Sequence, residues 1–178
     1  MPIDEQSLLT IIKGGEDENA YEASDILGKN GSKESQKELI GLLTHDNDDV
    51  KFLAARTLGL MTDNSLALEP LLAAIQDKAN AHIAGDLLMA LEGFDVSEHY
   101  VPIFKLYLFG SFKVSRIAKE ILDYKEFNIS PRVLKKAKKH WNHYTNNVKH
   151  DDSYLLVKRE VEEMFVDIEI FIEHMGDS

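Results

Sequence analysis

The chain has 178 residues, of which 44% are hydrophobic, and its 31 acidic and 20 basic side chains give a net charge of −11. The absence of cysteine excludes disulfides, thiol catalysis and cysteine-ligated metal sites. No apolar run approaches the roughly 20 residues of a membrane span, and the first 13 residues lack a signal-peptide pattern. A cytoplasmic protein with no membrane partner is therefore expected.

The charge is distributed unevenly along the chain. Its balance is −12 over residues 1–100, +8 over residues 101–150 and −7 over residues 151–178. A protein that is acidic overall repels nucleic acid and anionic lipid at long range. Because salt at 0.1 M screens charges over about 10 Å, the central basic block can still attract an anion locally.

Helical patterns follow one another from the N-terminus. Residues 1–15 are predicted to form a short helix that ends at a Gly-Gly pair. About four helical hairpins are predicted within residues 16–146. Their helices are expected at 21–27 and 34–43, 51–59 and 66–76, 83–91 and 97–109, and 114–122 and 131–144. Corresponding positions recur every 31 to 33 residues, which indicates a solenoid; the alternative is an irregular helical bundle.

Residues 48–59 read Asp-Asp-Val-Lys-Phe-Leu-Ala-Ala-Arg-Thr-Leu-Gly. This segment resembles the first helix of HEAT-like repeats, the short variety also found in phycobilisome lyases, and residues 66–75 resemble the second helix. The resemblance is strongest over residues 46–78 and weakens towards residue 144. It implies packing positions at Val50, Ala54, Ala55, Leu58 and Leu72, and it brings no catalytic residue.

The last segment, residues 151–175, is predicted to be a long amphipathic helix. Its apolar residues are spaced alternately by three and four, which is an a/d row over three heptads. They are Tyr154, Val157, Val161, Met164, Ile168, Phe171 and Met175. The row predicts a helix that caps the array; the alternatives are a homodimer through this helix or the docking of a partner helix.

The expected fold class is all-α, a right-handed α-solenoid of about four HEAT-like hairpins with a long C-terminal capping helix. Residues 1–178 are expected to form a single domain. In HEAT-like arrays the second helices line the concave face, so the resemblance implies that a partner binds there and along the edge formed by the turns.

Catalytic and metal-binding motifs are not found in the sequence. It contains neither a Gly-x-Ser-x-Gly elbow nor a phosphate-binding loop, and the histidine pair His140 and His143 falls short of a zinc ligand set. The chain is expected to be no enzyme and to need no cofactor or metal. The acidic residues Asp46, Asp48 and Asp49 only faintly resemble a calcium loop, since the required Gly and Glu are missing. They are expected at an inter-repeat turn, where they are candidates for partner binding.

A basic segment at residues 132–144 is the other candidate. Lys135, Lys136, Lys138 and Lys139 precede the single tryptophan, Trp141. Lysines bind phosphates and aromatic rings stack on single-stranded bases, so this helix is a candidate nucleic-acid site. The alternatives are a docking site for an acidic protein surface, or a solvated face whose apolar residues simply pack inward.

The HEAT resemblance implies a non-enzymatic protein-interaction module or scaffold, because most members of the wider family bind proteins. The acidic first 100 residues favour a basic protein partner, and an inhibitor or immunity-like protein is the sharper form of this hypothesis. The alternative is a nucleic-acid-binding or base-repair HEAT-like protein that uses residues 132–144. A third hypothesis, a lyase or chaperone for a chromophore, has no positive support.

Overall fold

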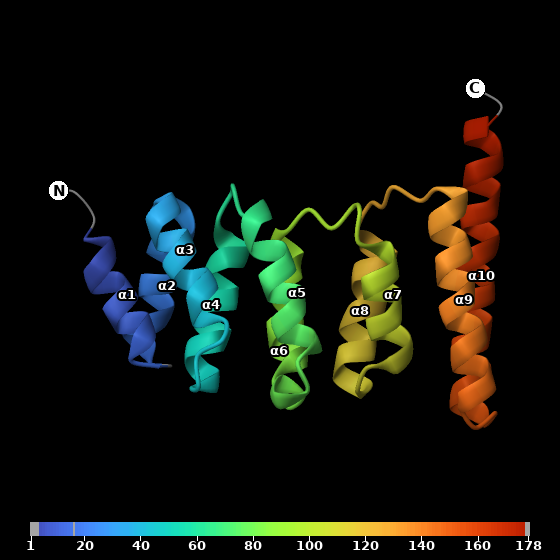
Figure 1. Ribbon diagram of the computed structural model, residues 1–178, viewed down its shortest axis with the longest axis horizontal. Helices are drawn as coiled ribbons and strands as arrows, with labels where there is room; N and C mark the ends of the chain where they lie inside the picture. Colours follow the sequence, from blue (N-terminus) through green and yellow to red (C-terminus); the bar gives the residue numbers. More distant parts are fainter. Residues whose placement is uncertain (1–3, 16, 177–178) are drawn as a thin grey trace. The chain divides into compact units, whose positions relative to one another are not determined.

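In a computed structural model that describes residues 4–15 and 17–176, the chain is helical and the described residues contain no strand (Figure 1). They form ten α-helices and three short 3₁₀ helices. The chain divides into two compact units, unit 1 (residues 1–95) and unit 2 (residues 96–178). The all-α fold class is as expected, and it is consistent with a HEAT-like helical solenoid. The prediction of a single domain over residues 1–178 stays a prediction.

Unit 1 contains α1 to α6, and most of these helices begin at a polar side chain that caps them. The helices are α1 (Glu5–Lys13), α2 (Glu18–Asn30), α3 (Lys33–Leu42), α4 (Asp48–Leu60), α5 (Leu68–Gln76) and α6 (Ala84–Met89), with η1 (Ser65–Ala67), η2 (Lys78–Asn80) and η3 (Ala90–Gly93). Asp4, Asp17, Ser32 and Asn47 accept hydrogen bonds from first-turn amides of α1 to α4. These amides have no partner within their helix, so each cap fixes a helix start.

Helices of unit 1 that are consecutive in the chain run antiparallel, and alternate helices also pack on one another (Figure 1). The most extensive contact in this unit is that of α2 with α4, and α1 with α2, α3 with α4 and α5 with α6 are also close pairs; α4 in turn packs on α6. Each expected second helix, such as α3, therefore packs mainly on the helix that follows it. Val50, Ala54, Ala55, Leu58 and Leu72 are all buried, which confirms the packing positions that the HEAT resemblance implied.

Three glycines of unit 1, Gly28, Gly59 and Gly93, lie where helices come very close. A Cβ on Gly93 would be 1.7 Å from the carbonyl oxygen of Gly59, so the backbones of α4 and η3 nearly touch. The expected end of the first hairpin helix at Gly28 is wrong, because α2 continues to Asn30. Inside the helix Gly28 makes room for Leu60, whose Cβ would lie 2.4 Å from an added Cβ.

Unit 2 contains four helices around an aromatic core. They are α7 (Tyr100–Phe109), α8 (Phe112–Tyr124), α9 (Pro131–Asn147) and α10 (Asp152–Gly176). Phe104 of α7 is fully buried, and its ring lies 5.7 Å from that of Phe165 on α10. The Tyr107 hydroxyl donates to Glu160 of α10 at 2.5 Å. These contacts fix the side of α10 that faces α7.

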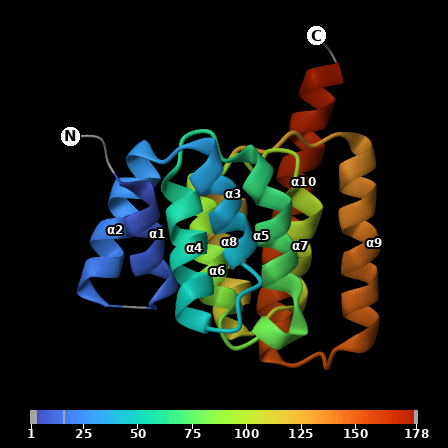
Figure 2. The ribbon, with the colours of Figure 1, turned by 60° about the vertical axis from the view of Figure 1, so that its left-hand side comes forward.

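The long C-terminal helix packs along only part of the predicted apolar row. Tyr154, Val161 and Ile168 are buried, whereas Phe171 and Met175 are 53% and 64% exposed. α10 has 25 residues and α9 has 17, so the C-terminal end of α10 extends past the start of α9 (Figure 2). None of the helices in the described residues combines the length and apolarity that crossing a bilayer requires.

Candidate functional site

The acidic turn predicted as a binding edge lies between α3 and α4 in unit 1. Asn47 caps α4 by accepting hydrogen bonds from the amides of Asp49 and Val50. This places the side chains of Asp46 and Asp49 on the surface, where both are exposed. The turn is therefore an inter-repeat turn and N-cap, as the sequence predicted.

Asp48 differs from its two acidic neighbours because it is already engaged. Its carboxylate is 2.8 Å from Lys51 Nζ and 2.5 Å from His82 Nε2. Hydrogen bonds first from Lys51 and then from His82 hold the pKa of Asp48 below its ordinary value of 3.8. Lys51 is 7% exposed and also donates to Asn80 Oδ1 at 2.6 Å. Asp48 thus has a structural role in joining α4 to the segment after α5.

A cleft of about 610 Å³ opens beside this network, between α3, α4, α5 and η2. Its apolar wall includes Ile40, Pro70 and Ala73, and its polar lining includes Asp46 and Asp77. An apolar wall next to exposed carboxylates suits a long cationic side chain, whose aliphatic stem packs while its charge pairs. The structure therefore brings Asp46 and Asp48 together at a cleft, and leaves Asp49 on the adjoining surface.

The basic segment forms α9, which begins at the Ser130 cap with Pro131 in its first turn. Leu134 and Ala137 are buried, while Lys135, Lys136 and Lys139 are exposed. Lys138 is half-buried, forms an ion pair with Glu169 of α10, and lies 5.8 Å from the Phe165 ring. One of the four candidate lysines thus stabilises the α9–α10 pair, and the other three remain on the surface.

Trp141 packs inside an aromatic stack. Its ring lies 5.6 Å from Tyr144 and 6.1 Å from Tyr154, and both pairs are stacked. The His150 ring stacks in turn on Tyr154, with 3.9 Å between the two ring centroids. Since its ring is engaged within unit 2, Trp141 supports the packing interpretation more than base stacking.

Two residues of α7 that the sequence did not single out adjoin the basic surface: Lys105 extends it, and Phe109 lies beside it. Lys105 is exposed, and Phe109 is 47% exposed with its ring 5.9 Å from His143. Burial first, and then the charges of Lys105, Lys139 and His143, lower the pKa of His140 from its ordinary value of 6.5. The sequence did contain a signal for Lys105. It precedes Lys136 by 31 residues, which is one repeat length, so the two lysines occupy corresponding positions of neighbouring hairpins.

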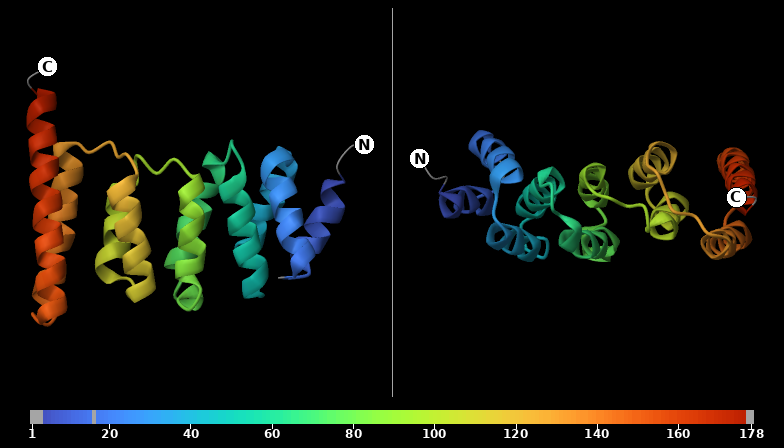
Figure 3. Two further views of the ribbon diagram at one scale, coloured as in Figure 1. Left: turned by 180° about the vertical axis from the view of Figure 1, so that it is seen from behind. Right: turned by 90° about the horizontal axis from the view of Figure 1, so that it is seen from above.

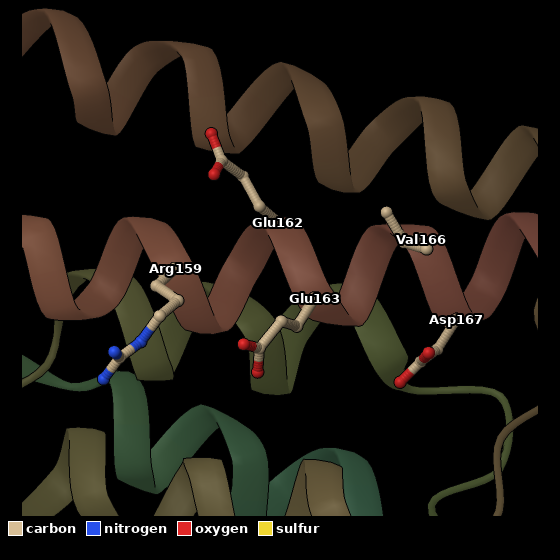
Figure 4. Close-up of a pocket in the computed structure, with 5 residues that line it drawn as sticks. All are labelled: Arg159, Glu162, Glu163, Val166 and Asp167. Atoms are coloured by element: carbon tan, nitrogen blue, oxygen red, sulfur yellow. The ribbon is translucent and has the colours of Figure 1, made fainter.

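The outer side of α10 carries a third charged feature. Arg159, Glu162, Glu163, Val166 and Asp167 line a shallow hollow of about 480 Å³. Figure 4 shows Glu162 and Val166 on one side of the helix, and Arg159, Glu163 and Asp167 on the other. Among residues 4–15 and 17–176, no group of three or more histidine, aspartate or glutamate side chains is arranged to hold a metal ion.

Comparison with known families matches residues 5–92 to the family described as HEAT repeats. The match begins at the first residue of α1 and ends within η3, so it falls entirely within unit 1. No curated protein and no solved structure matches the chain significantly.

Proposed function

Since this chain is a HEAT-like repeat protein, we propose that it is a non-enzymatic module that binds a basic protein partner through the acidic cleft of unit 1. HEAT repeats generally mediate protein–protein interaction or scaffolding, and stacked helical hairpins present extended surfaces for it. The observation that carries the proposal is the cleft of about 610 Å³ with the carboxylate of Asp46 at an apolar wall.

The charges around the cleft favour a cation. Asp48 is already paired with Lys51 and His82, so the exposed carboxylates near a partner are those of Asp46 and Asp77 in the cleft lining and that of Asp49 on the adjoining surface. A lysine or arginine of the partner can lay its stem on Pro70 and Ala73 and place its charge at Asp46. The balance of −12 over residues 1–100 also accelerates encounter with a basic protein.

The finer parts of the function stay predictions. An inhibitor or immunity-like role is supported by the size and charge of the chain, and a cytoplasmic location by its lack of cysteine. The alternative of nucleic-acid binding by α9 is supported by Lys135, Lys136 and Lys139, which are exposed, and is weakened by the packing of Trp141.

The test compares protein capture from a nuclease-treated lysate by the natural chain and two variants. The variant Asp46→Asn/Asp49→Asn removes one carboxylate charge of the cleft lining and one of the adjoining surface, while Glu18→Gln/Glu22→Gln removes two exposed charges elsewhere in unit 1. We expect one stoichiometric protein with the natural chain and the control, and about tenfold less with the cleft variant, which corresponds to roughly 1.4 kcal/mol. Equal capture by all three proteins would refute the proposal that the partner binds at this cleft.

A second arm addresses the nucleic-acid alternative. The variant in which Ser replaces Lys135, Lys136, Lys138 and Lys139 is compared with the natural chain in an untreated lysate at low salt, where phosphate contacts are strongest. Retention of nucleic acid by the natural chain and its loss in the variant would support the alternative. Equal retention by both would remove α9 as a nucleic-acid site.

A further inference from the structure

The outer side of the α9–α10 pair carries opposite charges on its two helices. Ala137 and Tyr144 of α9 face the packed side, where Tyr144 contacts Phe109 of α7 at 5.7 Å. A step of two residues turns a helix by about 200°, so Lys135 and Lys139, which flank Ala137, point away from α7. Neither lysine has an ion pair among the described residues. This side of α9 is therefore an unneutralised basic surface.

The same reasoning gives the outer side of α10. Glu160 and Met164 reach Tyr107 and Tyr100 of α7, so residues two positions further on point away from that helix. These are Glu162 and Val166, which line the hollow in Figure 4. The charged residues of this surface include Glu162 and Glu163 with one basic side chain, Arg159. It is apolar as well, because Leu155, Val166 and Ile170 are 57%, 52% and 48% exposed.

The two outer surfaces are at the same level along the helices. α9 and α10 are antiparallel, and the contacts of Lys138 with Glu169 and of Thr145 with Tyr154 fix their register. At about 1.5 Å per residue, Lys135 and Lys139 lie level with residues 162 to 169 of α10. Figure 3 shows α7 and α8 on one side of this pair, and the opposite side carries no other element of unit 2.

We infer that this outer side is the interface of a homodimer, in which α9 of each copy lies on α10 of the other. A two-fold axis parallel to the helices places Lys135 and Lys139 of one copy against Glu162 and Val166 of its partner, and the reverse contact follows by symmetry. The lysine stems cover Val166 and Ile170 while their charges pair with the glutamates. A second copy brings an acidic surface to the lysines of α9 and a basic surface to the glutamates of α10. Nucleic acid could pair with the lysines, but the glutamates of α10 would repel it.

The mass in solution is the first test. Light scattering after size exclusion, at about 0.1 mM chain and low salt, should give twice the chain mass of 20.2 kDa. The mass should fall towards that of one chain in about 0.5 M salt, because salt screens the exposed charge pairs. A single-chain mass at every salt concentration, or a mass above two chains, would overturn the reciprocal geometry.

Charge reversal gives the sharper test. Lys135→Glu/Lys139→Glu and Glu162→Lys/Glu163→Lys each place like charges across the interface, so each variant alone should be monomeric. An equimolar mixture of the two should dimerise again, because opposite charges then meet at both contacts. Lys29→Glu/Lys37→Glu, a reversal of two exposed lysines in unit 1, should leave the dimer intact.

Circular dichroism of each variant checks the fold, and the mass of the natural chain at low and high salt tests the inference even if one variant folds poorly. If both variants are folded and the mixture stays monomeric, the inferred pairing is wrong. Val166→Ser/Ile170→Ser should weaken the natural dimer about tenfold, and unchanged dimerisation would also contradict the interface. This inference concerns unit 2 alone, so its failure would leave the acidic cleft of unit 1 unaffected.

Discussion

Unit 1 and unit 2 are both built from antiparallel helices, but their cores are filled differently. The largest fully buried side chains of unit 1 are leucines and Ile12, and the backbones at Gly59 and Gly93 nearly touch. In unit 2 the corresponding side chain is Phe104, which packs with Phe165 and other rings. Small residues allow helices to approach closely, whereas aromatic rings fill the wider space between longer helices.

This difference explains where the family resemblance ends. The HEAT match covers residues 5–92, where no helix is longer than 13 residues and where Gly28 and Gly59 lie at close helix contacts. Unit 2 keeps the helical hairpins but uses helices of 17 and 25 residues with an aromatic core. The family match thus follows small and aliphatic packing residues. Beyond residue 92 the chain still forms helical hairpins, but with a different set of packing residues.

The largest expected effect tests the aliphatic core of unit 1. Leu58→Asp places a carboxylate at a position that is 0% exposed and offers no partner, so it should lower the free energy of unfolding by more than about 4 kcal/mol. Thermal and urea unfolding measure the loss. Leu66→Asp, at a position that is 70% exposed, is the control and should change stability by less than about 0.5 kcal/mol. Similar stability of both variants would contradict the repeat core.

A matched pair in unit 2 tests its aromatic core. Phe104→Ala removes a fully buried ring, and we expect a loss of about 3 to 4 kcal/mol from burial and cavity formation. Phe112→Ala removes a ring that is 83% exposed and should cost less than about 0.5 kcal/mol. Urea unfolding of the whole chain distinguishes the two. An equal loss in both variants would mean that unit 2 is not organised around Phe104.

The close approach of the backbones at Gly59 and Gly93 predicts a smaller loss of stability, and its control is expected to change stability in the opposite direction. Gly93→Ala forces α4 and η3 apart, because its Cβ would meet the Gly59 oxygen, and it should destabilise the chain by about 1 to 3 kcal/mol. Gly41→Ala in α3 meets nothing within 4 Å and should stabilise the helix by up to about 1 kcal/mol. Opposite signs in a melting experiment support the close approach; the same sign for both contradicts it.

The predictions from sequence were right where local pattern decides the structure and wrong where a contact between helices decides it. Repeat spacing located α2 to α9, and the HEAT resemblance correctly predicted that Val50, Ala54 and Leu58 are buried, because local pattern determines which face packs. The Gly-Gly pair located α1, and the apolar row located α10. The helix end at Gly28 was wrong, since that glycine serves a contact with Leu60 from a neighbouring helix.

Contacts between residues one repeat apart explain what the sequence left out of the candidate sites. The pairing of Asp48 with His82 joins residues 34 positions apart, and the basic surface is extended by Lys105 from the preceding hairpin. Charge patterns along one helix identified Asp48 and the α9 lysines as candidates. They gave no information on which charges are neutralised, because this depends on how neighbouring hairpins stack.

The smallest expected effect concerns the basic surface of α7 and α9. Burial lowers the pKa of His140 below 6.5, and the charge of Lys105 lowers it further, so Lys105→Gln should raise this pKa part of the way back. Because the unfolded chain binds the proton more readily, the free energy of unfolding should rise with pH up to about 6.5 and be lost as the pH falls towards the folded pKa.

Lys105→Gln should weaken this pH dependence, and an NMR titration of the His140 ring measures the change directly. Lys149→Gln, which removes an exposed charge that does not act on His140, is the control and should leave the titration unchanged. If Lys105→Gln left it unchanged as well, Lys105 and His140 would not share one surface, and the basic patch would belong to α9 alone. A shift confined to Lys105→Gln would instead show that α7 and α9 together set its potential, as their packing in unit 2 requires.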